Sequence, residues 1–202
     1  QSIANVILSC INPGDEVIIP TPYWVSYEQI IKLAEGVPVF IETSIENDFK
    51  ISSLQLQNAI SSKTKMMIYS SPCNPSGSIY TKQELRDLSN VLVSYPKIIV
   101  VSDEIYEHIN FTDSYFSIAC FEDMYNNVVT VNGVSKSFAM TGWRLGYIGA
   151  PEWIAKACIK IQGQFTSGTS GVSQRAALAA ISADPIVVSE MVSSFLKRRN
   201  FI

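Results

Sequence analysis

Aromatic, polar and charged residues directly follow four short apolar runs of this chain. After residues 16–20, 65–71, 97–102 and 127–132 the sequence offers in turn Trp24, Asn74, Asp103 with Tyr106, and Ser135 with Lys136. Arg144 follows Lys136 eight positions later, among small and apolar residues. A lysine, an acid, an arginine, an aromatic ring and hydrogen-bonding groups together fit an aromatic, anionic cofactor that reacts with an amine.

Each of these residues also has an ordinary structural role open to it. Asn74 in NPSG is a turn former, Asp103 can cap the segment after it, and Trp24 can lie in the core. Lys136 can reach solvent along its aliphatic stem, and Arg144 can form a structural ion pair. The joint occurrence, rather than any single residue, favours a cofactor site.

The elements that position these residues alternate between strand and helix. Apolar, β-rich runs predict strands at 16–20, 37–42, 65–71, 97–104, 127–132 and 145–150, each covered on both faces because the runs do not alternate with polar residues. Helices are expected at 24–35, 52–61 and 81–93, the last opened by a Thr81/Glu84 capping box, and throughout the chain from Pro151 onward. This order predicts an α/β protein, a three-layer α/β/α domain with a mostly parallel sheet. In such sheets ligands bind at the carboxyl ends of the strands.

The composition excludes several classes of protein. The chain has 202 residues, 47% hydrophobic content, a net charge of −3 and no basic block before Lys197, which disfavours nucleic acid and anionic membranes as partners. Four dispersed cysteines and a single histidine predict neither a disulfide framework nor a metal site, and they favour a cytoplasmic location. No apolar run approaches the roughly 20 residues that span a bilayer.

Both ends of the sequence lack the signals expected at the ends of a complete chain. Residues 1–11 lack an initiator methionine and a basic region, so they do not resemble a signal peptide. The last residues, SEMVSSFLKRRNFI, form a helical pattern without a stop signal. We therefore expect a fragment cut at both ends.

One acidic cluster raises the alternative of a metal hydrolase. The stretch DEIYEH holds Asp103, Glu104, Glu107 and His108. Its spacing matches neither HExxH nor HxxEH, because a first histidine is missing. We expect Glu107 and His108 to lie in a partly solvated loop instead.

Three motifs carry a family resemblance that extends over essentially the whole chain. SPCNPSG, VSDEIYEHINF and SKSFAMTGWRLGY, in this order and spacing, resemble the class I/II aminotransferases, the aspartate aminotransferase branch of the fold-type I pyridoxal phosphate enzymes. The stretch GDEVIIPTPYWVSYEQIIKLAEGVPV is similar to the segment that supplies the stacking aromatic there. The resemblance implies that residues 1–202 are part of the large, cofactor-binding domain, with an N-terminal segment and the C-terminal small domain missing.

The resemblance also assigns roles residue by residue, with pyridoxal 5'-phosphate as the cofactor. It implies that Lys136 forms the Schiff base, that Arg144 with help from Ser135 binds the phosphate, that Asp103 pairs with the protonated pyridine nitrogen, that Asn74 and Tyr106 hydrogen-bond the ring's 3-oxygen, and that Trp24 stacks on the ring. Elementary chemistry agrees. A desolvated lysine beside another cation loses its proton more easily, and arginine meets a phosphate with a planar fork of donors.

The sequence departs from the family pattern in two ways. Some members carry a phosphate-binding serine three residues before the lysine, where this chain has Gly133. The glycine-rich turn expected before the helix near Gln1, and the arginine that binds the substrate carboxylate beyond Ile202, lie outside these residues.

The expected activity is amino-group transfer between an L-amino acid, of the aspartate/glutamate or aromatic type, and a 2-oxo acid, with PYWVSY favouring the aspartate and prephenate subgroup. Two alternatives stay open: another pyridoxal phosphate reaction on the same scaffold, such as a β-lyase or a synthase, or the aminotransferase-like domain of a transcriptional regulator. Segment 162–176 lies near the dimer interface in the resembling family, which implies a homodimer; from its residues alone it reads equally as a loop with a helix cap. We expect residues 1–202 alone to be inactive.

Overall fold

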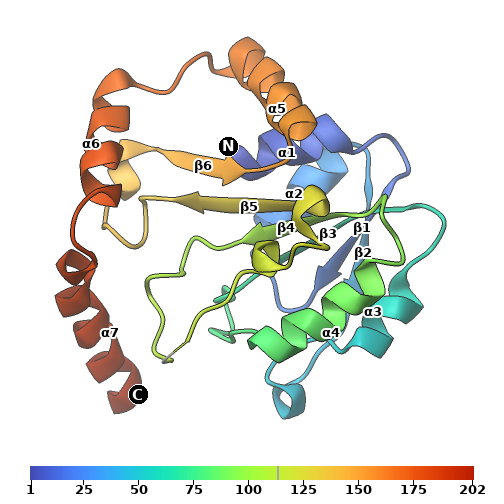
Figure 1. Cartoon of the computed structure of the whole chain (residues 1–202), viewed down its shortest axis with the longest axis horizontal. Coiled ribbons are helices and arrows are strands. Elements are labelled where there is room, and N and C mark those ends of the chain that lie inside the picture. The colour runs from blue at the N-terminus through green and yellow to red at the C-terminus, as the bar shows by residue number, and fades with distance from the viewer. Residues whose placement is uncertain (113) are drawn as a thin grey trace.

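A six-stranded sheet forms the centre of the protein. The computed structural model describes residues 1–112 and 114–202 (Figure 1). The strands are β1 (Glu16–Pro20), β2 (Val37–Ile41), β3 (Thr64–Ser70), β4 (Ile99–Asp103), β5 (Val128–Gly133) and β6 (Gly146–Gly149). They lie in the order β2-β1-β3-β4-β5-β6. β1 to β5 pair in parallel and β6 runs antiparallel to β5, so the predicted mostly parallel sheet is confirmed.

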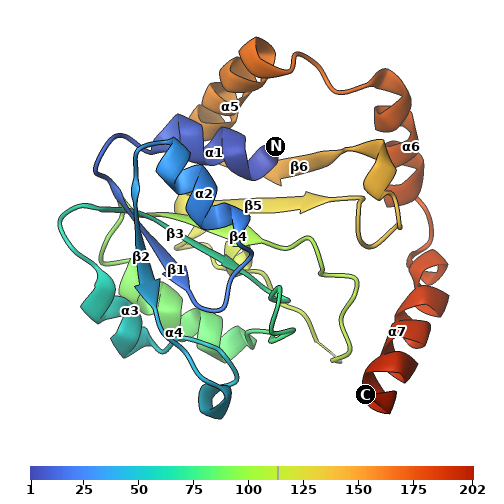
Figure 2. The same ribbon diagram turned by 180° about the vertical axis from the view of Figure 1, so that it is seen from behind.

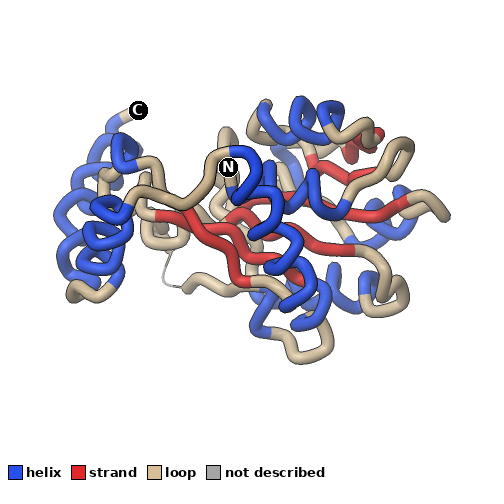
Figure 3. Tube along the Cα trace, turned by 90° about the horizontal axis from the view of Figure 1, so that it is seen from above, coloured by secondary structure: helices blue, strands red, loops and turns tan. Residues whose placement is uncertain are grey.

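Helices cover both faces of this sheet. One face packs against α1 (Ser2–Cys10), α2 (Ser26–Leu33) and α5 (Glu152–Phe165), and the other against α3 (Ser53–Ala59) and α4 (Lys82–Leu92). Figure 2 shows α1 and α2 side by side on the rear face, and Figure 3 shows the strands between the two helical layers. Each face has its own cluster of buried apolar side chains. The predicted three-layer architecture is confirmed.

The helix α4 shows why this sequence folds as expected locally. Thr81 accepts a hydrogen bond from the backbone N–H of Glu84 at 3.2 Å, and the Glu84 carboxylate accepts one from the Thr81 N–H at 2.7 Å. This capping box satisfies two amides at the start of the helix. Leu85, Leu88 and Leu92 then recur on one face and are buried, so the helix begins and packs as predicted.

Strand burial differs from the prediction at the two edges of the sheet. Every residue of β4 is buried, and so are most residues of β1 and β3. The expectation that all six strands are covered on both faces is wrong for β2 and β6, where most residues are exposed or half-buried. Both are edge strands, and an apolar run does not reveal which position in the sheet it will take.

The chain after residue 150 is helical, as predicted, but two details differ. Pro151 takes the N-cap position of α5 rather than the first turn. Residues 167–170 form a loop before α6 (Gly171–Ile181), as the alternative interpretation of segment 162–176 has it, but Ser170 makes no side-chain capping bond. The helices α6 and α7 (Ser189–Phe201) lie at one side of the layered body (Figure 3), and no residue of α7 is buried.

Neither a spanning helix nor a metal cluster is found in the part of the chain that the structure describes. No single helix there is long and apolar enough to cross a membrane; the pair Gly171–Ile181 and Ile186–Phe201, bent by 101°, meets the length and composition criteria only when joined. Within residues 1–112 and 114–202, no three His, Cys, Asp or Glu side chains gather in a way that would hold a metal ion.

Candidate active site

The parallel register brings the predicted residues to one edge of the sheet. Ser70, the last residue of β3, pairs with Asp103, the last residue of β4, and Asp103 pairs with Val131 on β5. The loops that carry Asn74 and Lys136 therefore leave the sheet beside Asp103. This is the carboxyl edge at which ligands of parallel α/β sheets bind.

Asp103 is held in a preformed, buried environment. Only 6% of the residue is exposed, and its Oδ2 accepts a 2.6 Å hydrogen bond from the Tyr27 hydroxyl. Burial raises the pKa of the Asp103 carboxyl, while the hydrogen bonds from Tyr27 and from the Ile105 N–H lower it in part. Burial and the Asp103 charge together raise the pKa of Tyr27 well above its usual value, so Tyr27 stays a donor. A buried carboxylate that accepts only two hydrogen bonds from neutral donors still favours a cationic partner.

Sequence reasoning missed Tyr27, although a signal for it existed. Tyr27 stands three positions after Trp24, and its N–H donates to the Trp24 carbonyl at 3.0 Å, so the turn that opens α2 places both rings on one side. The two rings meet edge to face, with centroids 5.5 Å apart and planes at 88°. Trp24 is 39% exposed, which rules out the purely structural alternative of a core residue and leaves its ring available to a ligand.

The loop after β3 holds Asn74 in a compact turn. The Cys73 N–H donates to the Ser78 carbonyl at 2.9 Å, and the Gly77 N–H donates to the Cys73 carbonyl at 2.8 Å. Gly77 has φ +76°, a conformation that glycine adopts without strain. The Asn74 N–H also donates to the Ser70 hydroxyl at 3.3 Å, which ties the turn to the end of β3. The turn thus presents Asn74 beside the Asp103 strand.

Lys136 lies on the connection between β5 and β6 and is exposed, as is Arg144 on the same connection. The Lys136 Nζ lies 5.7 Å from the centroid of the Tyr106 ring, so two residues predicted to share a site do meet. Lys136 is exposed in the part of the protein that the structure describes, so its desolvated setting stays a prediction. Within residues 1–112 and 114–202, no carboxylate lies within 4.0 Å of its Nζ.

Arg144 points its charge toward the start of α1. Its guanidinium donates to the Thr141 carbonyl at 2.6 Å, which fixes the fork against its own loop. A Cβ at Gly146, two residues after Arg144, would lie 3.4 Å from the Ser2 Oγ, so the start of α1 lies beside the connection that carries Arg144. Figure 1 shows the N-terminus beside β6, the strand that begins two residues after Arg144. A helix N-terminus and an arginine converge here, and both favour an anion.

The glycine at position 133 has a structural cause. A Cβ at Gly133 would lie 2.9 Å from the Leu145 carbonyl oxygen and 3.0 Å from the Gly146 Cα. The two ends of the loop that carries Lys136 and Arg144 approach this closely, so a serine does not fit without a backbone shift. The departure from the family pattern follows from the narrow neck of this loop.

Two serines beside Lys136 behave differently. Ser135 is half-buried, and the described contacts give its hydroxyl no partner, so its phosphate-binding role stays a prediction. Ser137 is 1% exposed, and its Oγ lacks a hydrogen-bond partner among the described residues. No sequence signal distinguishes Ser137 from the other serines of the chain.

This fold and this site define a protein class. The family model for aminotransferase class I and II matches residues 1–202. The chain therefore belongs to the class I and II aminotransferase family, and pyridoxal phosphate is the cofactor of that family.

Particular relatives narrow the comparison. The chain is 48% identical over its whole length to an aspartate/prephenate aminotransferase of Nitrosomonas europaea and covers 51% of that protein. It is 45% identical to a bifunctional aspartate aminotransferase and glutamate/aspartate-prephenate aminotransferase of Petunia hybrida and covers 43% of it. The crystal structure of an aspartate aminotransferase from Rhizobium meliloti superimposes with a TM-score of 0.96 at 39% identity, over 98% of this chain and 50% of that one. The chain spans about half the length of these relatives.

The described residues fit pyridoxal phosphate chemically. Arg144 and the start of α1 supply positive charge for a phosphate, and buried Asp103 supplies a carboxylate for a protonated ring nitrogen. Trp24 offers an exposed ring for stacking, and Lys136 offers an amine that pairs with no described acid.

Proposed function

We propose that the protein is a pyridoxal phosphate-dependent aminotransferase that moves an amino group between an L-amino acid and a 2-oxo acid. The observation that carries this proposal is the meeting of Lys136 and Tyr106 beside a buried, hydrogen-bonded Asp103 at the carboxyl edge of the sheet. When bound, pyridoxal phosphate supplies an aldehyde and an electron-withdrawing ring that stabilises negative charge at the α-carbon of the substrate.

The residues of this chain have distinct tasks in that reaction. Asp103 holds a proton on the ring nitrogen, and Tyr27 keeps Asp103 ionised by donating to Oδ2. Arg144 and the start of α1 bind the phosphate. Asn74 and Tyr106 donate to the ring oxygen, and Trp24 packs on the ring face. The Lys136 Nζ would be the amine that holds the cofactor, and it would serve as the general base for the α-proton of the substrate.

The substrate class that we propose is aspartate, glutamate or an aromatic amino acid, with a 2-oxo acid as acceptor. The relatives from Nitrosomonas europaea and Petunia hybrida, which are named for aspartate and prephenate, support this choice. The PYWVSY stretch, which includes both Trp24 and Tyr27, agrees with that subgroup.

We further infer a cytoplasmic enzyme of amino acid biosynthesis that works as a homodimer, of which residues 1–202 form part of the cofactor-binding domain. The proposal of a dimer is supported by exposed apolar side chains on the helices after β6, among them Leu178, Ile181, Val187 and Phe201. Exposed apolar side chains favour burial against further protein surface, which a second copy would supply.

The test is the visible absorption of the full-length gene product that contains this chain, reconstituted with pyridoxal phosphate. The parent protein should show the band of the lysine-bound cofactor, and aspartate, glutamate or an aromatic amino acid without any oxo acid should replace it by the band of the aminated cofactor. Lys136→Ala should abolish the first band and the turnover, because an alanine has no amine to react. Lys63→Ala, at an exposed lysine before β3, is the matched control and should change neither.

Two results would overturn the proposal. If the band persists in Lys136→Ala, another amine holds the cofactor. If cysteine-like substrates give pyruvate and ammonia while no amino acid yields the aminated cofactor, the protein is a β-lyase rather than an aminotransferase.

A further inference from the structure

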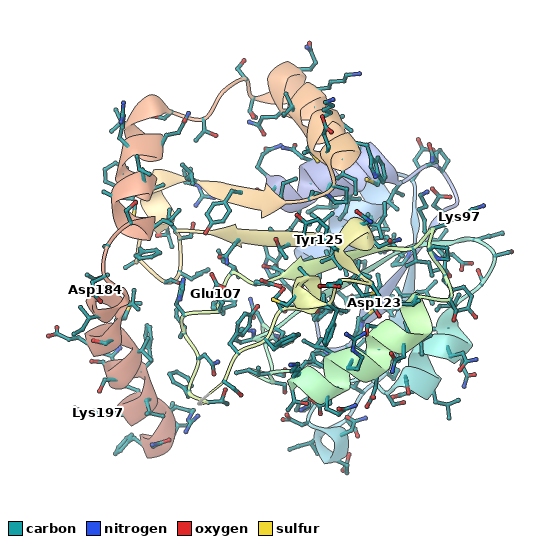
Figure 4. The ribbon with its side chains drawn as sticks, in the orientation of Figure 1. Lys97, Glu107, Asp123, Tyr125, Asp184 and Lys197 are labelled. Carbon is teal, nitrogen blue, oxygen red and sulfur yellow. The ribbon has the colours of Figure 1, made fainter. Side chains whose placement is uncertain are left out.

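The segment after β4 is attached to the end of β5, just before the connection that carries Lys136, by a hydrogen bond between side chains. The Glu107 Oε1 accepts from the Asn132 Nδ2 at 2.6 Å, across 25 residues of sequence. Figure 4 labels Glu107 on the segment that leaves β4, facing the end of β5 where Lys136 follows. Asn132 itself is oriented by its Oδ1, which accepts from the Gly133 N–H at 2.8 Å. The amide therefore directs its donor toward Glu107.

Contacts on either side of Glu107 join the same two segments. The preceding residue, Tyr106, lies under the Lys136 Nζ, and the following residue, His108, meets the Phe138 ring with centroids 6.1 Å apart. A Cβ at Gly133 would lie 3.3 Å from the Ile105 side chain. Residues 105–108 thus pack along the loop from 132 to 138, but the other three contacts are apolar or cation–π contacts without the directionality of a hydrogen bond.

Within residues 1–112 and 114–202, only the first residue of this segment makes a backbone hydrogen bond to β5 or to the loop that follows it. The Glu104 N–H donates to the Val131 carbonyl at 2.8 Å and extends the β4–β5 pairing. The bonds that follow are internal to the turn, from the Glu107 N–H to the Glu104 carbonyl and from the Ile109 N–H to the Tyr106 carbonyl. The position of Tyr106 relative to Lys136 therefore depends on side chains, and the bond of Glu107 is the one side-chain hydrogen bond described between residues 105–108 and residues 132–138.

We propose that Glu107 is a positioning residue that, through its hydrogen bond to Asn132, sets the distance between the Tyr106 hydroxyl and the Lys136 amine. The inference rests on the proposed function, because both groups would act on the bound cofactor. A bond between a carboxylate and an amide is stronger than a bond between neutral groups, and misplacement of a donor by about 1 Å already weakens it strongly.

Charged neighbours of Glu107 make a conservative substitution informative. The His108 Nε2 lies 3.3 Å from the Glu107 Oε1, and burial together with the Glu107 charge raises the pKa of Tyr147, which pairs with Asn132 across β5 and β6. Glu107→Gln keeps an acceptor for Asn132 and removes the charge that acts on His108 and Tyr147. Glu107→Ala removes both.

The experiment is a pH titration of the full-length gene product, followed by the visible band of the lysine-bound cofactor. The midpoint is the pH at which half of the lysine-bound cofactor has changed from its protonated to its deprotonated form. This midpoint depends on the hydrogen-bond donors to the ring oxygen. A purely structural role of Glu107 would leave the midpoint unchanged. Glu107→Ala and Asn132→Ala should each shift the midpoint by about half a pH unit or more, and the double variant should shift it no further. Glu107→Gln should restore the parent midpoint. Glu122→Ala, at an exposed carboxylate of the same strand connection, should leave it unchanged.

A Tyr106→Phe background gives the second measurement, and in it Glu107→Ala should cause no additional shift. The inference is wrong if Glu107→Ala leaves the midpoint unmoved, if Glu107→Gln shifts it as far as Glu107→Ala does, or if the shift survives in full without the Tyr106 hydroxyl. A parent protein that forms no visible band would instead overturn the proposed function, so the two failures are distinguishable.

Discussion

The acidic and the cationic sides of the candidate site are built in opposite ways. Asp103 ends a fully buried strand, is 6% exposed and already has Tyr27 as its partner. Lys136 and Arg144 are exposed on the connection between β5 and the edge strand β6. The fold thus keeps its anion in place at a cost in desolvation, and it leaves its cations accessible to a ligand.

This difference follows from the chemistry of each group. A buried carboxylate without partners would take up a proton, so it needs hydrogen bonds in advance. An exposed lysine or arginine keeps its hydration at little cost, and its geometry is set by the loop, here by the close approach at Gly133 and by contacts from the segment after β4. We therefore expect changes at Asp103 to affect both stability and rate, and changes on the loop to affect mainly the cofactor.

Among substitutions that keep Lys136, Asp103→Asn should have the largest effect on the reaction. Asparagine can still accept from Tyr27 but has no charge to hold a proton on the cofactor ring, so kcat should fall roughly 100- to 1,000-fold. The measurement is single-turnover transamination at saturating cofactor. Asp87→Asn, at an exposed carboxylate of α4, should leave the rate unchanged.

Asp103→Asn should lower the rate but raise the stability of the cofactor-free protein, and it should weaken the dependence of that stability on pH. The raised pKa of Asp103 means that the folded state binds more protons than the unfolded state, so without cofactor the free energy of unfolding falls as pH rises from the ordinary carboxyl value of 3.8 through the raised pKa. Asp103→Asn should reduce this slope and stabilise the cofactor-free protein above it. Glu104, whose pKa burial also raises, keeps part of the slope. If the slope of unfolding free energy against pH is unchanged, burial does not raise the pKa of Asp103.

Arg144→Gln should have the next largest effect, on cofactor affinity. Loss of charge-assisted bonds to a phosphate costs about 1.5–3 kcal/mol, or roughly 10- to 100-fold in Kd. Arg144→Lys should recover only part of the affinity, because an ammonium lacks the planar fork. Fluorescence titration with pyridoxal phosphate measures both, and Arg175→Gln on α6 is the exposed control. Equal affinity in all four proteins would move the phosphate site away from this loop.

The comparison also shows what the sequence could and could not predict. The strands β1 and β3 lie within one residue of their predicted bounds, and the capping box of α4 is present, because each depends on neighbours in sequence. The bond from Tyr27 to Asp103 joins residues 76 apart, and the exposure of β2 and β6 depends on sheet order. Both are set by the topology, which local patterns do not encode. The close approach of Gly133 to Leu145 likewise joins residues 12 apart, so neighbouring residues in the sequence do not reveal it.

Tyr27→Phe should give the smallest effect and the sharpest distinction between the two sides. Without the hydroxyl, Asp103 loses a hydrogen bond that lowers its pKa, so the carboxyl keeps its proton to a higher pH than in the parent protein. We expect kcat/KM to fall by about tenfold at low pH and to approach the parent value as pH rises and Asp103 ionises in both proteins.

The matched control is Tyr69→Phe on β3. The Tyr69 hydroxyl accepts a hydrogen bond from the Ser102 hydroxyl. Ser102 precedes Asp103 on β4, so the two side chains project from opposite faces of the sheet. Its loss should lower stability without moving the pH profile. A Tyr27→Phe rate that is reduced equally at every pH would mean that Tyr27 acts by packing against Trp24 rather than by keeping Asp103 ionised, and the acidic side would then be no better prepared for its ligand than the cationic loop.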